Sequence, residues 1–228
     1  MPTAVKHSPA GARGARSRPR ARRLAPEARR AQLLAGAVEV FARRGLDSAR
    51  HAEIADTCGV SVPTVFAYFA SRAELVEAVL REVARFYVDL ARRVHSVERA
   101  APELILEHAR AFASSVDAQP DYARVWLAWS SAVSADTWPR YLELEEEVVA
   151  ILARTLERGQ AEGTIGRAIA AEDGARITIG AAHMIAQMKL SGRDADEVDR
   201  FEDHLVRALS GGLATSGPGL GRGMPDVL

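Results

Sequence analysis

One segment, residues 48–69, constrains the fold of this chain more than any other. Small and apolar side chains such as Ala55 predict a short helix, and Gly59 supplies the positive φ at which a helix ends without a Cβ clash. Ser61 is a favourable N-cap for a second short helix, in whose first turn Pro63 costs little. The sequence therefore predicts two short helices joined by a tight turn.

The second of these helices, residues 61–69, has two different faces. Val62 and Phe69 return at helical spacing with either Val65 or Phe66, so this face points inward. The opposite face carries small side chains and hydroxyls, which can approach base edges in a DNA major groove about 12 Å wide. We favour a helix-turn-helix with residues 61–69 as recognition helix. An ordinary corner between two packed helices is the alternative.

The first 24 residues carry an unbalanced positive charge, although the chain has a formal net charge of zero. Seven lysine and arginine residues precede the first acidic residue, Glu27, so this stretch is +7 and the remainder is −7. Such asymmetry favours a polyanionic partner. Because the stretch has little to bury, we expect a disordered arm that enters the DNA minor groove. A solubilising tail would have the same composition.

Composition limits the class of protein. The chain has 228 residues, of which 48% are hydrophobic. It has no unbroken apolar run of about 18 residues, so we expect no membrane span. The Arg- and Pro-rich N-terminus is unlike a secretory signal, and we expect a cytoplasmic protein that joins the nucleoid when bound to DNA. The single cysteine, Cys58, excludes an internal disulfide network; we expect it to be buried and inert, and a redox role stays open.

Helical periodicity and capping residues predict an all-α chain. We expect a basic arm over residues 1–24, a DNA-binding domain over 25–70, a helical regulatory and dimerisation domain over 71–211 and a flexible tail over 212–228. Ser71 and Glu74 form a capping box at the start of a long helix. The expected helices outside the two-helix segment cover 26–44, 72–95, 102–116, 121–134, 140–159, 173–190 and 197–209.

All three tryptophans lie within a 13-residue stretch, 126–138. With nearby aromatic and aliphatic side chains they could line a ligand pocket, or they could be plain core. No arginine or lysine cluster converges there, so a ligand of this pocket would be a small, largely apolar effector. The candidate pocket residues are Phe112, Tyr122, Trp126, Leu127, Trp129 and Trp138.

The last two expected helices carry more apolar surface than a terminal pair needs. We predict that two such pairs form a four-helix homodimer interface, with packing inside one chain as the alternative. A dimer would hold two recognition helices apart so that they read half-sites about 34–36 Å apart, or a multiple of that. The candidate interface residues are Ile177, Ala181, Met184, Ile185, Met188, Phe201, Leu205 and Leu209.

Motifs of catalysis are missing from the sequence. It has no phosphate-binding Gly-rich loop, no G-x-S-x-G and no H-E-x-x-H. The glutamates of residues 143–147 form a solvated helical face without a His or Cys partner. We therefore expect no enzyme, no metal and no cofactor. An architectural DNA-binding protein that acts through the arm alone is the alternative function.

Residues 42–80 resemble the DNA-binding domain of TetR-family repressors, through an Ala-Arg-Arg-Gly helix end, a Gly-Val-Ser turn, a Tyr-Phe pair and Arg-x-Glu-Leu. The resemblance extends to the LuxR/HapR/SmcR branch of quorum-sensing regulators. It rests on Arg18-Pro19-Arg20, on EVFARRG (39–45), on HAEIA (51–55) and on VWLAWSSAVSADTWP (125–139), and covers roughly residues 16–210.

The resemblance implies a TetR-like fold and a homodimer on double-stranded DNA, with a quorum-sensing type of regulation. It assigns the minor groove to Arg18 and Arg20. Ala67 stands where that branch has Asn, and alanine cannot make bidentate hydrogen bonds to adenine, so the operator should differ. The expected base contacts are Ser61, Pro63 and Thr64 with Ala67 at the edge. The expected phosphate contacts are Tyr68 and Arg72, and His51 either contacts phosphate or caps its helix.

Overall fold

The computed structural model describes residues 24–133 and 135–211, and within these ranges it contains helices and no strand. None of the described helices is both long and apolar enough to cross a membrane. In chain order the helices are α1 (Pro26–Arg44), α2 (His51–Cys58), α3 (Val62–Tyr68), α4 (Arg72–His95), α5 (Ala101–Ala118), α6 (Pro120–Ser130), α7 (Trp138–Glu162), α8 (Ala171–Leu190) and α9 (Ala195–Leu209).

Side-chain and glycine caps fix the helix ends around the turn, as the sequence predicts. Gly59 ends α2 in the left-handed region with φ 65°. The Ser61 hydroxyl accepts a hydrogen bond from the Thr64 N–H at 3.3 Å and begins α3. At the start of α4 the Ser71 hydroxyl accepts from the Glu74 N–H at 3.1 Å. These caps satisfy amide groups that have no partner inside a helix.

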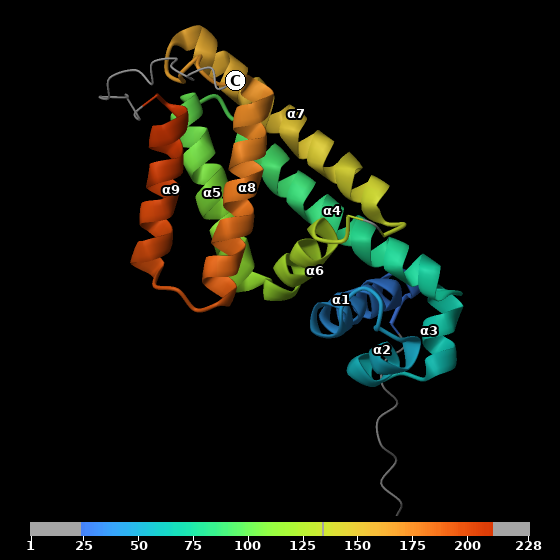
Figure 1. Ribbon diagram of the computed structural model, residues 1–228. Coiled ribbons are helices and arrows are strands. Elements are labelled where there is room, and N and C mark those ends of the chain that lie inside the picture. The colour runs from blue at the N-terminus through green and yellow to red at the C-terminus, as the bar shows by residue number, and fades with distance from the viewer. Residues whose placement is uncertain (1–23, 134, 212–228) are drawn as a thin grey trace, which may run out of the picture.

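The molecule has a head, made of α1 to α3, and a body, made of α4 to α9 (Figure 1). Helix α4 has 24 residues and so spans about 36 Å, from the head into the body. In the body α7 runs along α4, while α5, α8 and α9 lie beside one another. Helix α1 packs against α6 as well as α4, so two body helices contact the head.

Apolar side chains close the core of the head. Phe41 of α1, Ile54 of α2, Val65 of α3 and Phe69 are each at most 1% exposed. Helices α1 and α2 approach closely because Gly36 has no side chain: a Cβ there would lie 2.3 Å from the Sγ atom of Cys58. Tight packing of this kind orients the short helix α3, which has too few residues to be stable alone.

The structure differs from the sequence expectation at the ends of body helices. Helix α6 ends at Ser130, where the sequence suggested 134. The Trp129 indole N–H donates to the carbonyl oxygen of Thr137 at 3.0 Å, so the chain folds back after α6. Helix α7 then begins at Trp138, with Pro139 in its first turn, and continues to Glu162.

Candidate nucleic-acid interface and cavity

Helix α3 is anchored by its apolar face and presents the opposite face to solvent. Val65 and Phe69 are fully buried in the head. Ser61, Pro63 and Ala67 are exposed and Thr64 is half-buried, so the residues expected to contact bases lie on one accessible surface. Helix α3 itself has no charged side chain. A surface of this kind can read base edges by hydrogen bonds and methyl contacts.

The hydroxyl groups of Ser61 and Thr64 lie 2.8 Å apart and share a hydrogen bond. The Ser61 hydroxyl also caps α3. Both hydroxyls are therefore held in position at the start of the helix. Each retains further hydrogen-bonding capacity toward a base, because a hydroxyl carries one donor and two acceptor sites.

His51 lies inside the head. It is 8% exposed, and its Nε2 atom lies 2.9 Å from the carbonyl oxygen of Phe69. Its ring stacks on the ring of Phe66 with centroids 4.1 Å apart. His51 thus connects α2 with the end of α3, in place of the phosphate contact or helix cap expected from the sequence.

Phe66 is a candidate site residue that sequence reasoning missed. It is 47% exposed on α3, where the sequence left Val65 and Phe66 as alternatives for the inward position. The exposure of Phe66 could have been predicted from the sequence, because residues 62, 65 and 69 share one helical face and residue 66 lies beside that face. An exposed ring next to Ala67 adds apolar surface suited to a thymine methyl group.

Arg72 and Tyr68, the expected phosphate contacts, lie where α3 ends and α4 begins. Arg72 is exposed, and its guanidinium donates a hydrogen bond to the carbonyl oxygen of Leu46. Tyr68 is half-buried. Arg44 at the end of α1 pairs with Glu53 at 2.6 Å. The expected minor-groove residues Arg18 and Arg20 lie outside the described residues.

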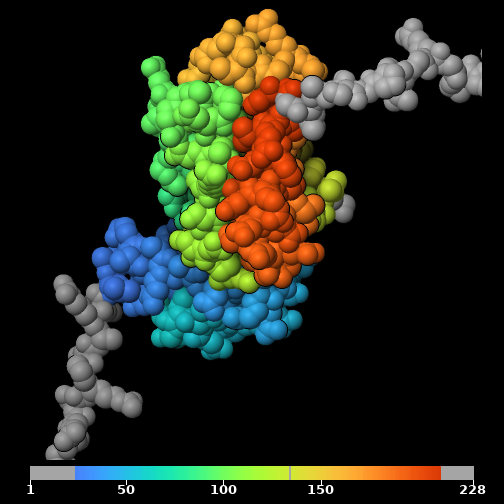
Figure 2. Space-filling view, turned by 90° about the vertical axis from the view of Figure 1, so that its left-hand side faces the viewer, coloured from blue at the N-terminus to red at the C-terminus, as the bar shows by residue number. Residues whose placement is uncertain are grey.

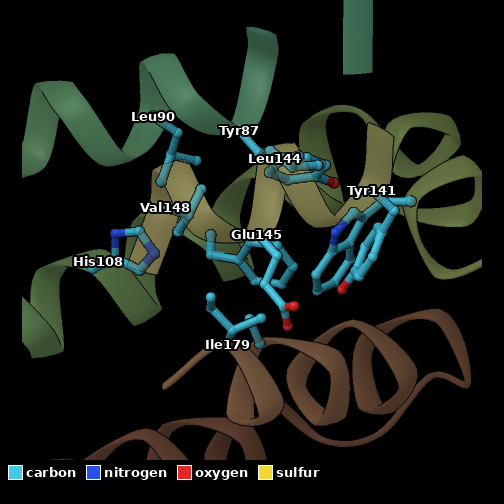
Figure 3. A pocket seen from close by; sticks show the side chains of 11 residues that line it. Tyr87, Leu90, His108, Tyr141, Leu144, Glu145, Val148 and Ile179 are labelled. Atoms are coloured by element: carbon cyan, nitrogen blue, oxygen red, sulfur yellow. The ribbon is translucent and has the colours of Figure 1, made fainter. Parts of the chain in front are cut away.

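A cavity of about 40 Å³ lies in the body, between α4, α5, α6, α7 and α8 (Figure 3). Aromatic rings form one wall: the ring centroids of Tyr87, Phe112 and Trp126 lie 5.4 to 5.5 Å from one another. The lining residues are Tyr87, Leu90, His108, Phe112, Trp126, Tyr141, Leu144, Glu145, Val148, Ile179 and Ala182.

The structure brings Phe112 and Trp126 together at this cavity but not the other candidate pocket residues. Trp129 is 1% exposed and packs edge-on against Tyr141. Trp138 stacks on the same tyrosine, with ring centroids 5.0 Å apart. Trp129 is a core residue at the junction of α6 and α7, and Trp138 is partly buried against this core.

Tyr122 and Leu127 also lie away from the cavity. The Tyr122 hydroxyl donates to the carboxylate of Glu82 at 3.2 Å. Burial, with Glu82 nearby, raises the pKa of Tyr122 to about 12. Leu127 is half-buried against the hydrophobic core. Both residues belong to the packing of α6.

Four side chains with a hydroxyl, imidazole or carboxyl group line the cavity: Tyr87, His108, Tyr141 and Glu145. The Tyr87 hydroxyl and the Nδ1 atom of His108 are buried and have no hydrogen-bond partner among the described residues. Burial, and to a lesser extent nearby His95, lowers the pKa of His108 to about 3, so its imidazole is neutral. Glu145 is half-buried and lines the cavity. The sequence placed it on a solvated face, although it lies one turn after the buried Tyr141.

Helices α8 and α9 expose part of the surface expected to form the dimer interface. Ile177 and Met184 are each 45% exposed, and a Cβ on Gly180 between them would meet nothing within 4 Å. Figure 2 shows α9, in red, running lengthwise over the face of the body that is turned to the viewer. Met188 and Phe201 are half-buried, whereas the buried candidates pack within the chain: Ala181, Ile185, Leu205 and Leu209.

Cys58 has the properties of a structural thiol. It is half-buried, and its Sγ atom donates to the carbonyl oxygen of Gln32 at 3.6 Å. Burial, together with Glu39, raises the pKa of the thiol, which disfavours the reactive thiolate. Among the described residues no group of three or more His, Cys, Asp or Glu side chains is placed to hold a metal ion.

Residues 33–79 match the family model described as bacterial regulatory proteins, tetR family. Over 147 residues the chain is 35% identical to the HTH-type transcriptional regulator LuxR of Vibrio harveyi. The aligned segment covers 63% of this chain and 71% of that protein. The matched segment includes most of α1, all of α2 and α3, and the first two turns of α4.

Solved structures share the fold. A TetR-like transcriptional regulator from Rhodococcus sp. RHA1 superposes with a TM-score of 0.70 at 22% identity, covering 85% of this chain and all of that one. The transcriptional regulator FadR from Bacillus subtilis, in complex with stearoyl-CoA, superposes with a TM-score of 0.67 at 17% identity, covering 80% and 98%. The helical body and the head therefore occur together in other regulators.

Proposed function

The chain belongs to the TetR family of DNA-binding transcriptional regulators, and on this basis we propose that it acts as a homodimer on a pseudo-palindromic operator. The observation that carries the proposal is the surface of α3, which is anchored by Val65 and Phe69 and presents hydroxyls and methyl groups to solvent. We assign base contacts to Ser61, Pro63, Thr64, Phe66 and Ala67.

We assign phosphate contacts to residues that lie beside the recognition helix. Arg72 and Tyr68 follow α3, and the bond from Arg72 to Leu46 holds the guanidinium close to the head. Phosphate contacts of this kind orient a protein on DNA without reading sequence. Arg18 and Arg20 would add a minor-groove contact from the arm that precedes Leu24.

Dimerisation through α8 and α9 would place two recognition helices on one duplex. The exposed stripe formed by Ile177, Gly180 and Met184 gives this interface an apolar centre. Large exposed apolar patches are typical of interaction surfaces. Under this proposal residues 25–70 form the DNA-binding domain and residues 71–211 the dimerisation and regulatory domain.

The cavity suits a small effector that controls DNA binding. Tyr87 and Leu90 belong to α4, which runs into the head, and Trp126 belongs to α6, which packs on α1. A ligand that favours one arrangement of these helices would change the distance between two recognition helices in a dimer. FadR, a regulator of the same fold, was solved in complex with stearoyl-CoA, which supports effector control in this fold.

The similarity to LuxR supports a quorum-sensing type of regulation in the cytoplasm, with the protein on the nucleoid when bound to DNA. An architectural role through the arm alone is the second candidate, supported by the +7 charge of residues 1–24. These two functions predict different selectivity. An arm-only binder would show little preference among duplexes.

Fluorescence anisotropy with the full chain tests the proposal. A duplex recovered by selection should bind about 10³-fold or more tightly than a scrambled duplex of the same length, with two chains on each duplex. Equal affinity for both duplexes, or one chain on each duplex, would contradict it.

A further inference from the structure

One carboxyl side chain, that of Glu145, lines the cavity in the body. No lysine or arginine lines the cavity, and burial keeps His108 neutral. Within the described part of the chain, no lysine or arginine approaches Glu145 to within the 4.0 Å of an ion pair. Figure 3 shows its side chain among the cavity residues, next to Ile179 of α8.

Two nearby glutamates, one on α7 and one on α4, do have cationic partners. Glu147 pairs with Arg92, and Glu77 pairs with Arg140 at 2.8 Å. Glu145 is turned toward the body interior, one turn after the buried Tyr141 and beside the buried Leu144. Because no lysine or arginine of the described chain pairs with Glu145, its carboxylate is available to a positively charged ligand.

The remaining walls also suit a cation. The rings of Tyr87, Phe112 and Trp126 form one continuous aromatic wall. A cation within about 6 Å of an aromatic ring face is attracted by its quadrupole. The unpartnered Tyr87 hydroxyl and the unpartnered His108 Nδ1 atom can each accept a hydrogen bond from an N–H group.

We propose that the effector recognised by this cavity is a small organic ammonium ion, whose N–H groups and positive charge are held by Glu145 against the aromatic wall. The inference rests on the effector role proposed above and names the chemical class of the ligand. The small volume of the cavity, about 40 Å³, favours a short alkylammonium over a long acyl chain. A ligand carboxylate would meet the like charge of Glu145.

Three probes of equal chain length isolate the charge: butylammonium, 1-butanol and butyrate, each titrated by saturation-transfer NMR at one ionic strength. At pH 7 the amine is protonated. Butylammonium should bind about tenfold more tightly than 1-butanol, which is about 1.4 kcal/mol, and butyrate should bind most weakly. Equal or tighter binding of 1-butanol or butyrate, or no binding of any probe, would overturn the proposal.

Glu145→Gln keeps the shape of the side chain and removes its charge. The preference for butylammonium over 1-butanol should fall to about twofold or less, while 1-butanol binding reports that the cavity is intact. Glu146→Gln, at an exposed position of α7, is the matched control and should keep the full preference. A preference that persists in Glu145→Gln would contradict the assignment, and the probe series with the unmodified chain decides the question independently of any variant.

A parallel titration separates this inference from the proposed function. Operator affinity is measured by anisotropy with and without saturating butylammonium. A change in affinity would support both the ligand class and effector control. Ammonium binding without any change in DNA affinity would contradict effector control and leave the ligand class standing. Operator binding without ammonium preference would reject the ligand class and leave the DNA-binding function standing.

Discussion

The Nε2 atom of His51, the first residue of α2, lies 2.9 Å from the carbonyl oxygen of Phe69, the residue that ends α3. This bond joins the two helices of the helix-turn-helix at the end away from their turn. His51→Ala would leave a buried carbonyl without its partner, so we expect a loss of about 1 to 3 kcal/mol in the free energy of unfolding.

Urea denaturation followed by circular dichroism measures this loss. The exposed His204→Ala is the control and should change stability by less than about 0.5 kcal/mol. A stability equal to that of the unmodified chain would show that the bond is unimportant.

The contact between Gly36 and Cys58 predicts a specific rescue. A Cβ at position 36 would lie 2.3 Å from the Cys58 Sγ atom, so Gly36→Ala should destabilise the head by about 1 to 3 kcal/mol. Adding Cys58→Ala removes the obstructing sulfur and should restore most of the loss. A double-mutant cycle by urea denaturation measures the coupling, and strictly additive effects would contradict this packing.

Glu202 predicts a pH dependence of stability. It is 1% exposed, and burial, with Asp199 nearby, raises its pKa from 4.5 to about 7. The raised pKa means that the folded chain binds the proton more tightly than the unfolded chain. The resulting stabilisation is fully present below about pH 4.5 and is lost as the pH rises through about 7.

Glu202→Gln keeps this position uncharged at every pH. At pH 8 the variant should be more stable than the unmodified chain by about 1 to 3 kcal/mol, and at pH 5 the difference should be much smaller. Thermal unfolding at both pH values checks this, with Glu197→Gln, also on α9, as the control. A gain of equal size at pH 5 and pH 8 would show that ionisation of Glu202 is not its cause.

The exposed stripe on α8 predicts loss of dimerisation after charge insertion. Ile177→Glu combined with Met184→Glu places two carboxylates on side chains that are each 45% exposed, so the fold of one chain should be kept. Sedimentation equilibrium should find a dimer for the unmodified chain and a monomer for the double variant. Leu142→Glu, at a position of α7 that is 37% exposed, should leave the dimer intact. A dimer that survives the double substitution would place the interface elsewhere.

Local signals in the sequence were enough to predict the head. Ser61 and Ser71 as caps and Gly59 as a helix end are properties of single residues and their neighbours, so they are readable without tertiary contacts. The same signals located α1 from Pro26 to Arg44.

The body was predicted less completely because its side chains are sorted by contacts between distant helices. Trp129 and Trp138 sit close to Trp126 in sequence, yet they pack around Tyr141 and away from the cavity. In the sequence, Glu145 cannot be distinguished from the solvated glutamates around it. Its place at the cavity results from the packing of α4, α5 and α8. Composition could not distinguish these environments.

Selection of binding sites from random DNA tests the central claim most directly. With the unmodified chain, the recovered duplexes should share a pseudo-palindrome whose half-sites are about 34–36 Å apart, or a multiple of that. Thr64→Val should change the preferred base at one position in each half-site, because it removes a hydroxyl from the exposed face of α3. Recovery of duplexes without a shared motif, or an identical motif from the Thr64 variant, would contradict the role assigned to α3.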